Sequence, residues 1–358
     1  MSIGIDARAA VEVAAGRGRF VRETLAALSR RNDDVRYLCY ARSRWGASLD
    51  ERFEWRLIDA PDPRWHLLTA RAANRECDVF LSTNSYLTTW ILRIPSVPVI
   101  YDMVAFDRSH RPNLRSLVIE RLTLGLAVRR SRAFIAISHA TAQDFERRYR
   151  AAAGRVTVAP LGVAPQLAGS LAEGNDSVLP ASGFVLAVGT LEPRKNLPRL
   201  VAAYELLDDQ LQRRHPLVVV GDIGWQADET IAKLRSLGDR AALLGHVSDE
   251  TLSELYRRCA IFCYPSLYEG FGLPVLEAMA AGAAVVTSDV SSLPEVGGEA
   301  VEYADPRDPS SIARAITRLL SSPERRAALG AAAQARAALF DWGATAETVL
   351  DVLRRAAA

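Results

Sequence analysis

Lysine is almost absent from this sequence, since only Lys195 and Lys233 appear among its 44 basic residues. Arginine fills nearly every cationic position, so each lysine is a candidate for a place where arginine would not serve. Four cysteines without a Cys-x-x-Cys pair exclude a disulfide scaffold and a structural zinc site. The longest stretch without a charged residue, 156–172, has 17 residues and contains two prolines. It is too short to span a membrane, which takes about 20 apolar residues.

The remaining composition is that of an ordinary globular protein, with 49% hydrophobic and 24% charged residues in a chain of 358. This composition excludes a fibrous or disordered protein, and the length predicts two domains of roughly 150–200 residues each. The first residues, 1–8, predict a β-strand followed by charges rather than a secretion signal. We therefore expect a cytoplasmic protein.

Charge is distributed unevenly between the two halves of the chain. Residues 1–166 contain 26 arginines and 17 acidic residues, whereas residues 167–358 contain 18 basic and 25 acidic residues. A basic half is typical of proteins that meet a phosphorylated acceptor, an acidic membrane or a nucleic acid, although a solvated arginine-rich surface fits as well. A nucleic acid is the weakest of these partners, because aromatic residues are only 7% of the chain and no nucleic-acid motif appears.

Short apolar runs alternate with helical patterns, which predicts an α/β fold with parallel sheets covered by helices. Strands are predicted at 2–6, 36–40, 55–58, 79–82, 98–101, 133–137, 155–158, 183–189, 217–220, 242–244, 261–264 and 284–287. Helices are predicted at 21–30, 114–130, 197–207, 228–237, 249–259, 274–281, 309–320, 323–338 and 342–355. The domains follow as residues 1–166, a linker at 167–182 rich in small residues, residues 183–338, and a final helix within 339–358. Two doubly wound domains would bind a ligand at the carboxyl ends of their strands.

One segment joins a glycine-rich loop to a short helix. Pro274 suits the first turn of this helix and Gly282 its far end. The main-chain N–H groups at 270–273 then face outward at the positive end of a helix, where anions bind. Glu269 and Glu277 flank the loop, and because a carboxylate repels phosphate, we expect them to accept hydrogen bonds from sugar and ribose hydroxyls. The alternative is an ordinary turn with two solvated glutamates.

A second segment places Arg194 and Lys195 just before a helix that Asn196 is expected to cap. Cations are unfavourable at the start of a helix unless an anion is shared between them. Arginine gives planar bidentate contacts to phosphate, and lysine supplies a compact point charge. The pair therefore predicts a clamp for a diphosphate, with two exposed cations in a turn as the alternative.

Together these motifs resemble those of the retaining nucleotide-sugar glycosyltransferases of glycosyltransferase family 4, the glycosyl transferases group 1. The matching residues are Glu269 and Glu277 around Gly-Phe-Gly-Leu-Pro, and Gly-Thr-Leu-Glu-Pro-Arg-Lys-Asn at 189–196. The resemblance covers the whole chain and implies the GT-B fold, in which two Rossmann-like domains face a central cleft and a C-terminal helix crosses back to the first. It also implies hexose transfer by front-face displacement, without a metal or another cofactor.

By motif, the resemblance implies that Arg194 and Lys195 hold the donor's diphosphate, Glu277 the ribose, and Glu269 the transferred sugar. Arg194, Lys195 and Glu269 would then be the catalytic residues. Further donor-binding positions are Gly16, Gly189, Val247, Gly270, Phe271, Gly272 and Leu273. Gly16 would approach the diphosphate from the first domain, and Val247 would lie near the nucleobase. The amino-acid sequence of the motifs is most similar to that of bacterial mannosyltransferases of polysaccharide assembly. This resemblance implies GDP-mannose as the donor, and UDP- and dTDP-sugars stay open as alternatives.

One position departs from the family pattern, because many relatives have His-Asp where this chain has Tyr101 and Asp102. We expect both residues near the acceptor or the reacting centre, where Tyr101 can donate a hydrogen bond but cannot act as a histidine would. Asp305 and Asp308 are typical of a turn rather than of a metal-binding Asp-x-Asp, so no metal is implied.

Two other functions stay open: a nucleotide-sugar epimerase or phosphorylase on the same fold, and a non-catalytic partner that binds a sugar nucleotide. Product analysis with and without an acceptor separates them from a transferase. The expected acceptor is a glycan, a lipid-linked saccharide or a small glycoside. A lipid-linked acceptor would place the protein at the inner face of a membrane, where arginines such as those in 129–132 would attract anionic lipid.

Overall fold

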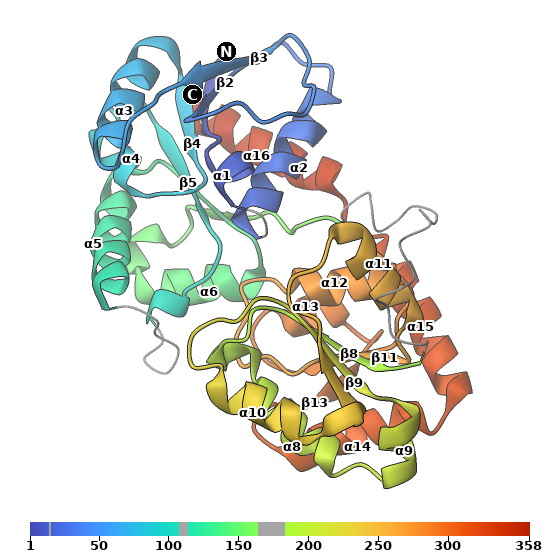
Figure 1. Cartoon of the computed structure of the whole chain (residues 1–358). Helices are drawn as coiled ribbons and strands as arrows, with labels where there is room; N and C mark the ends of the chain where they lie inside the picture. The colour runs from blue at the N-terminus through green and yellow to red at the C-terminus, as the bar shows by residue number, and fades with distance from the viewer. Residues whose placement is uncertain (14–15, 107–113, 164–182) are drawn as a thin grey trace. The chain divides into compact units, whose positions relative to one another are not determined.

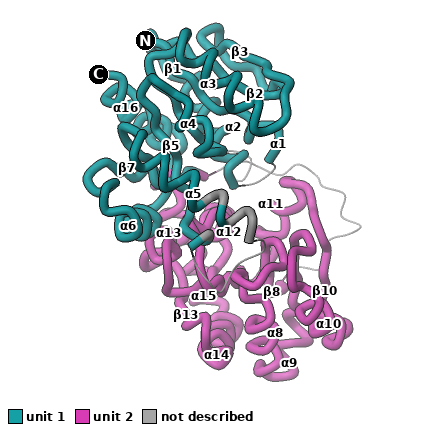
Figure 2. Tube along the Cα trace, turned by 90° about the vertical axis from the view of Figure 1, so that its left-hand side faces the viewer, with its two compact units in different colours: residues 1–162, 341–358 teal, residues 163–340 magenta. Residues whose placement is uncertain are grey.

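The computed structural model describes residues 1–13, 16–106, 114–163 and 183–358. The chain forms two compact units: unit 1 consists of Met1–Gly162 and Asp341–Ala358, and unit 2 of Val163–Phe340 (Figure 2). The last residues of the chain thus belong to the first unit. The predicted linker at 167–182 lies outside the described residues.

Unit 1 is built on a seven-stranded sheet in the order β3-β2-β1-β4-β5-β6-β7. Neighbouring strands are parallel throughout. The strands are β1 (Ser2–Asp6), β2 (Arg36–Ala41), β3 (Phe53–Leu57), β4 (Val79–Ser82), β5 (Ser96–Ile100), β6 (Phe134–Ala136) and β7 (Val156–Val158). The order reverses between β1 and β4, so a ligand is expected at the carboxyl ends of these strands.

Helices cover this sheet, and the last of them comes from the far end of the chain. They are α1 (Ala9–Glu12), α2 (Arg17–Ser29), α3 (Arg64–Glu76), α4 (Leu87–Ile91), α5 (Leu114–Arg130), α6 (His139–Arg148) and α16 (Trp342–Ala357), with 3₁₀ turns η1 (Val104–Phe106) and η2 (Arg150–Ala152). The Asp341 carboxylate begins α16 by accepting the Ala344 N–H at 3.0 Å. α16 packs its apolar face against α2 (Figure 1).

Unit 2 contains a six-stranded parallel sheet in the order β10-β9-β8-β11-β12-β13. Its strands are β8 (Val185–Val188), β9 (Leu217–Val220), β10 (Ala241–Leu243), β11 (Ile261–Tyr264), β12 (Val285–Ser288) and β13 (Glu302–Ala304). The surrounding elements are η4 (Pro193–Lys195), α8 (Leu197–Glu205), α9 (Asp209–Arg214), α10 (Asp228–Ser236), η5 (Gly238–Arg240), α11 (Asp249–Arg258), α12 (Leu273–Ala280), α13 (Leu293–Gly297), α14 (Pro309–Leu320) and α15 (Pro323–Ala337). Val185, Leu200, Leu217 and Ile316 share one buried cluster between sheet and helices. The order reverses between β8 and β11, which is the expected ligand position in this unit.

Every predicted strand has a counterpart whose ends differ by two residues or fewer. The helix expected from residue 21 begins earlier, at Arg17. The patterns missed β13 and the helices α1, α3, α4, α6, α9 and α13, of which α1, α4 and α13 have only four or five residues. β13 has only three residues, and α6 and α9 are mostly polar, so their sequences carry too little apolar periodicity to be detected.

Candidate functional site

The carboxyl ends of β8 and β11 bring together two segments that are distant in the sequence. These strands pair in parallel, so the loops that follow them start side by side. Lys195 Nζ lies 2.7 Å from Glu269 Oε1, and Arg194 Nη1 lies 2.7 Å from Glu269 Oε2. The structure thus groups the three residues for which the sequence predicts a catalytic role.

Glu269 is 7% exposed and forms the centre of this group. Besides Lys195, its Oε1 atom accepts hydrogen bonds from Ser266 Oγ at 2.6 Å and from the Tyr264 hydroxyl at 2.8 Å. Burial raises the pKa of Glu269, but the charges of Lys195 and Arg194 and the hydrogen bonds from Lys195 and Ser266 outweigh it and lower the pKa to about 2. Glu269 is therefore an anion at neutral pH.

Sequence reasoning missed Tyr264 and Ser266 as site residues. Both lie at the carboxyl end of β11, directly before Glu269, and this position was the available signal.

Lys195 occupies a closed position beside Tyr264. Its ammonium group donates to the Tyr264 hydroxyl and lies 4.8 Å from the centre of that ring. Burial lowers the pKa of Lys195, an effect that the charge of Glu269 opposes. Gly189 leaves room for the lysine stem: a Cβ atom there would lie 3.3 Å from Lys195 Cε, and its φ of 141° suits glycine alone.

The charges of this cluster balance within the protein. Arg194 Nε contacts Glu192 Oε1 at 2.7 Å, so two cations face two carboxylates, Glu192 and Glu269. The sequence predicts that cations before a helix share an anion, and in this structure the protein's own carboxylates take that place. A phosphate entering the site must therefore share these cations with Glu269.

Asn196 does not cap the following helix as expected. It lies at the N-cap position with a left-handed φ of 61°, but its side chain makes no capping hydrogen bond. Its Nδ2 atom instead donates to Pro265 O at 2.9 Å and to Pro306 O at 2.6 Å. Asn196 thereby ties the cation segment to the loops after β11 and β13.

The loop before α12 presents open main-chain donors. Gly272 adopts a φ of 106°, and a Cβ atom there would lie 2.8 Å from Leu293 Cδ2. Phe271 is 4% exposed, and its ring packs edge-on against Phe340 with 5.9 Å between the ring centres. Within the part of the chain that the structure describes, the N–H groups of Phe271, Gly272 and Leu273 have no acceptor. They can receive an anion at the start of this helix.

Glu277 lies on α12 and is 4% exposed, so the alternative of two solvated glutamates is wrong. The Tyr256 hydroxyl of α11 donates to Glu277 Oε2 at 3.1 Å.

The loop with Val247, which is half-buried, meets the loop after β9, because the Gly221 N–H donates to Gly245 O at 2.8 Å. A Cβ atom on Gly221 would lie 2.2 Å from Gly189 O, which explains this glycine.

In unit 1, the predicted residues follow strands β1 and β5. Gly16 has a φ of 54° and stands at the start of α2. Tyr101 is buried between Phe20, 5.6 Å away by ring centres, and the Arg17 guanidinium. Its hydroxyl has no partner among the described residues, and burial raises the pKa of Tyr101 well above 10.0. Asp102 accepts the Val104 N–H at 3.0 Å and so holds the turn η1.

Sequence reasoning also missed a buried ion cluster at the carboxyl end of β1. Arg8 is 2% exposed, contacts Asp6 at 2.8 Å and Asp62 at 3.3 Å, and stacks over Trp65 at 3.7 Å.

In the described ranges, no helix is long and apolar enough to cross a membrane. No three His, Cys, Asp or Glu side chains in those same ranges converge as a metal site.

Solved structures of glycosyltransferases share this fold over nearly the whole chain. HepE of Anabaena in complex with UDP-glucose aligns with a TM-score of 0.77 at 18% identity, covering 99% of this chain and 100% of HepE. WaaG, a glycosyltransferase of lipopolysaccharide biosynthesis, aligns with a TM-score of 0.75 at 17% identity, covering 99% of both chains. The two sheets of this chain are therefore those of the GT-B fold.

Sequence relatives include two mannosyltransferases of Escherichia coli. O-antigen chain mannosyltransferase B is 43% identical over 171 residues, which are 47% of this chain and 45% of that protein. The serotype-specific mannosyltransferase WbdA is 33% identical over 274 residues, 73% of this chain and 33% of WbdA. The chain thus spans less than half the length of these relatives.

Family models match both units of the chain. The model described as Glycosyl transferases group 1 matches residues 178–336, which carry the cluster of Lys195 and Glu269. The model described as Glycosyltransferase Family 4 matches residues 14–167. With the motifs, the fold and these matches in agreement, the chain belongs to glycosyltransferase family 4.

Proposed function

We propose that this chain transfers a hexose, mannose by expectation, from a nucleotide diphosphate to a glycan or glycolipid acceptor with retention at the anomeric carbon. The observation that carries the proposal is the cluster of Arg194, Lys195 and Glu269 at the carboxyl ends of β8 and β11. The names of the E. coli relatives support mannose, and GDP-mannose is the proposed donor. UDP- and dTDP-sugars are the competing donors.

Two groups of hydrogen-bond donors in the protein suit the diphosphate of the sugar nucleotide. Arg194 and Lys195 offer charge-assisted hydrogen bonds, and the N–H groups of Phe271, Gly272 and Leu273 offer neutral ones. A diphosphate beside Lys195 would add negative charge to a lysine whose pKa burial now lowers, and would raise that pKa again. The bound donor therefore keeps the ammonium group charged.

The proposed reaction takes place on one face of the sugar. The bond between the anomeric carbon and the diphosphate oxygen breaks while the acceptor oxygen bonds to the same carbon from the same side. The acceptor proton passes to the departing phosphate oxygen, so the step requires no side-chain base. Arg194 and Lys195 stabilise the charge that grows on the leaving diphosphate, and the proposal includes no metal ion.

Glu269 has a double role in this proposal. Its Oε1 atom already accepts from Lys195, Tyr264 and Ser266, and a carboxylate has only about four lone-pair positions in all. We therefore infer that Glu269 first holds the two cations in place and binds a sugar hydroxyl through Oε2. Glu277, hydrogen-bonded to Tyr256, keeps the proposed ribose contact.

The proposed acceptor is a lipid-linked saccharide. It would bring the basic unit 1 to an anionic membrane at the inner face of the cell, as a peripheral contact. Small soluble glycosides are the competing acceptors.

A ligand panel followed by product analysis tests the function. A sugar nucleotide present at a concentration of about 100 times its Kd stabilises the folded chain by about 2.7 kcal/mol, so thermal shifts rank the sugar nucleotides by affinity. GDP-mannose should give the largest shift, and nuclear magnetic resonance should show a mannoside with the donor's anomeric configuration. An epimer or free sugar formed without an acceptor, or binding without turnover on any mannoside acceptor, contradicts the proposal.

A further inference from the structure

The arginines of unit 1 differ in their partners. Those near β1, β2 and β3 face carboxylates: Arg8 with Asp6, Arg36 with Glu54, Arg42 with Asp62, Arg52 with Asp50 and Arg56 with Glu76. Arg93, Arg130 and Arg132, which we call the arginine patch, are exposed and form no ion pair with any carboxylate in the described ranges. Arg130 does donate one hydrogen bond, from Nη1 to Trp90 O at 2.9 Å, which leaves its charge unbalanced. Three arginines whose charge no described carboxylate balances thus lie close together in this unit.

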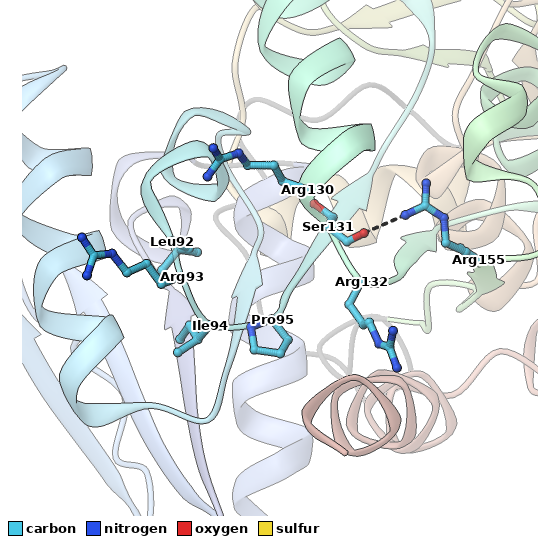
Figure 3. Close-up of a pocket in the computed structure, with 8 residues that line it drawn as sticks. All are labelled: Leu92, Arg93, Ile94, Pro95, Arg130, Ser131, Arg132 and Arg155. Atoms are coloured by element: carbon cyan, nitrogen blue, oxygen red, sulfur yellow. Dashed lines mark hydrogen bonds between the residues drawn. The ribbon is translucent and has the colours of Figure 1, made fainter.

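The arginine patch lines a depression of about 670 Å³ at the amino ends of β5, β6 and β7 (Figure 3). Arg155 lies at the same place but has a structural role, because its guanidinium donates to Ser131 O at 2.8 Å and to Val128 O at 2.9 Å. Tyr101 follows β5 at the opposite, carboxyl end of the sheet. The depression is thus separate from the proposed reacting centre.

Figure 3 shows that the guanidinium groups of Arg93, Arg130 and Arg132 point apart rather than toward one point. A single small anion cannot contact all three. An extended surface that carries many phosphate groups can, and this geometry favours such a surface over a free phosphate.

An exposed apolar stripe leads to the patch. Val118, Leu122 and Leu126 of α5 are 53%, 61% and 41% exposed and stand four residues apart, on one side of the helix. Arg129, at the end of α5, lies on the same side, and Arg130 follows it. A helix with an apolar stripe beside arginines is typical of segments that lie in a membrane interface.

We propose that this α5 stripe and the arginine patch together form a docking surface for an anionic lipid bilayer. The arginines contact lipid phosphates, and the stripe enters the boundary between headgroups and acyl chains. The inference assigns residues to the membrane contact of the proposed function and rests on that proposal for its purpose. Its test measures binding without turnover, so it succeeds or fails independently of the sugar transferred.

The test measures sedimentation of the full chain with vesicles of phosphatidylcholine and phosphatidylglycerol in equal amounts. The triple variant Arg93→Gln, Arg130→Gln, Arg132→Gln should bind about a hundredfold more weakly at low salt, since each arginine near such a surface contributes roughly fivefold. A control variant, Arg44→Gln, Arg214→Gln, Arg235→Gln, removes the same charge from exposed arginines elsewhere. It should bind within a few-fold of the original chain, and equal weakening by both variants overturns the proposal.

Two further arms separate a bilayer from a soluble anion. Leu122→Gln with Leu126→Gln changes only exposed positions and should weaken the binding that persists at high salt, where electrostatic attraction is screened. Full displacement by inorganic phosphate at constant ionic strength, without any effect of these leucine changes, would assign the patch to a free anion and overturn the docking surface. Mannose transfer to a soluble mannoside should be the same in the patch variant and in the original chain. If the original chain itself transfers no mannose, the proposed function fails, whereas the docking surface is judged by vesicle binding alone.

Discussion

Replacing Lys195 by arginine keeps the charge but changes the shape of the cation. Lys195 Nζ fits between Glu269 Oε1 at 2.7 Å and the ring of Tyr264, with its centre at 4.8 Å, and the lysine stem runs against Gly189. A planar guanidinium is larger than this space, and excess volume in a packed site costs about 1–3 kcal/mol. Displacement of the cation from the diphosphate should lower kcat at least tenfold, or about 1.4 kcal/mol of transition-state stabilisation.

Steady-state kinetics with GDP-mannose and a mannoside acceptor measure this effect, and thermal unfolding separates it from loss of folded protein. The only other lysine supplies the control. Lys233 is 39% exposed and contacts Glu229 at 2.8 Å one turn away on α10, a geometry that arginine reproduces. Lys233→Arg should therefore keep kcat and KM at the original values.

Equal kcat/KM values for Lys195→Arg and Lys233→Arg would refute the diphosphate clamp. A lower melting temperature with unchanged kcat would show that Lys195 serves only to neutralise Glu269. Either result removes Lys195 from the transition state.

Glu269→Gln should lower kcat and destabilise the fold. Because the pKa of Glu269 is lowered from 4.5 to about 2, its contribution to the free energy of unfolding is complete above pH 4.5 and is lost as the pH falls toward 2. Urea unfolding should therefore show the stability difference between variant and original chain shrinking over that pH range. Glu277→Ala should mainly weaken donor binding, seen as a higher KM with similar kcat, since a ribose contact is equal in ground and transition states. Tyr101→Phe should change the unfolding free energy by less than about 1 kcal/mol, because its hydroxyl has no described partner, and any fall in kcat/KM would then report a substrate contact. Asn196→Ala should cost about 1–3 kcal/mol in chemical denaturation, since it leaves Pro265 O and Pro306 O without their donor, and an unchanged midpoint would contradict this.

The strands of both sheets were predictable because each is a short apolar run bounded by turn residues. β9 (Leu217–Val220) is four consecutive aliphatic residues, and all four are buried. β13 lies at the edge of the sheet, where β12 is its only neighbouring strand among the described residues. Its sequence, Glu-Tyr-Ala, is not an apolar run, so the pairing with β12 decides its conformation. Asn196 shows the same limit, because its distant partners Pro265 and Pro306 replace the local cap that the sequence favours.

The arginines illustrate what charge counts leave undecided. The sequence establishes an excess of cations in the first half of the chain, but it does not distinguish Arg8, buried between Asp6 and Asp62, from Arg132, exposed and without a carboxylate among the described residues. Pairing depends on which side chains the folded sheet brings within a few ångströms, and that is a property of the strand order.

Apolar runs, glycine, proline and residue choice are local signals. They make most of the strands, the glycine-rich loop before α12 and the lysine in place of an arginine visible in the sequence alone. The contact between Lys195 and Glu269, which are 74 residues apart and meet at 2.7 Å, arises only when the chain is folded. The chain leaves β8 for β9 and β10 and returns to β11 on the other side of β8, so the two carboxyl ends become neighbours. Hydrogen bonding between β8 and β11 joins two segments that are far apart in the sequence, and no local pattern encodes which strands will pair.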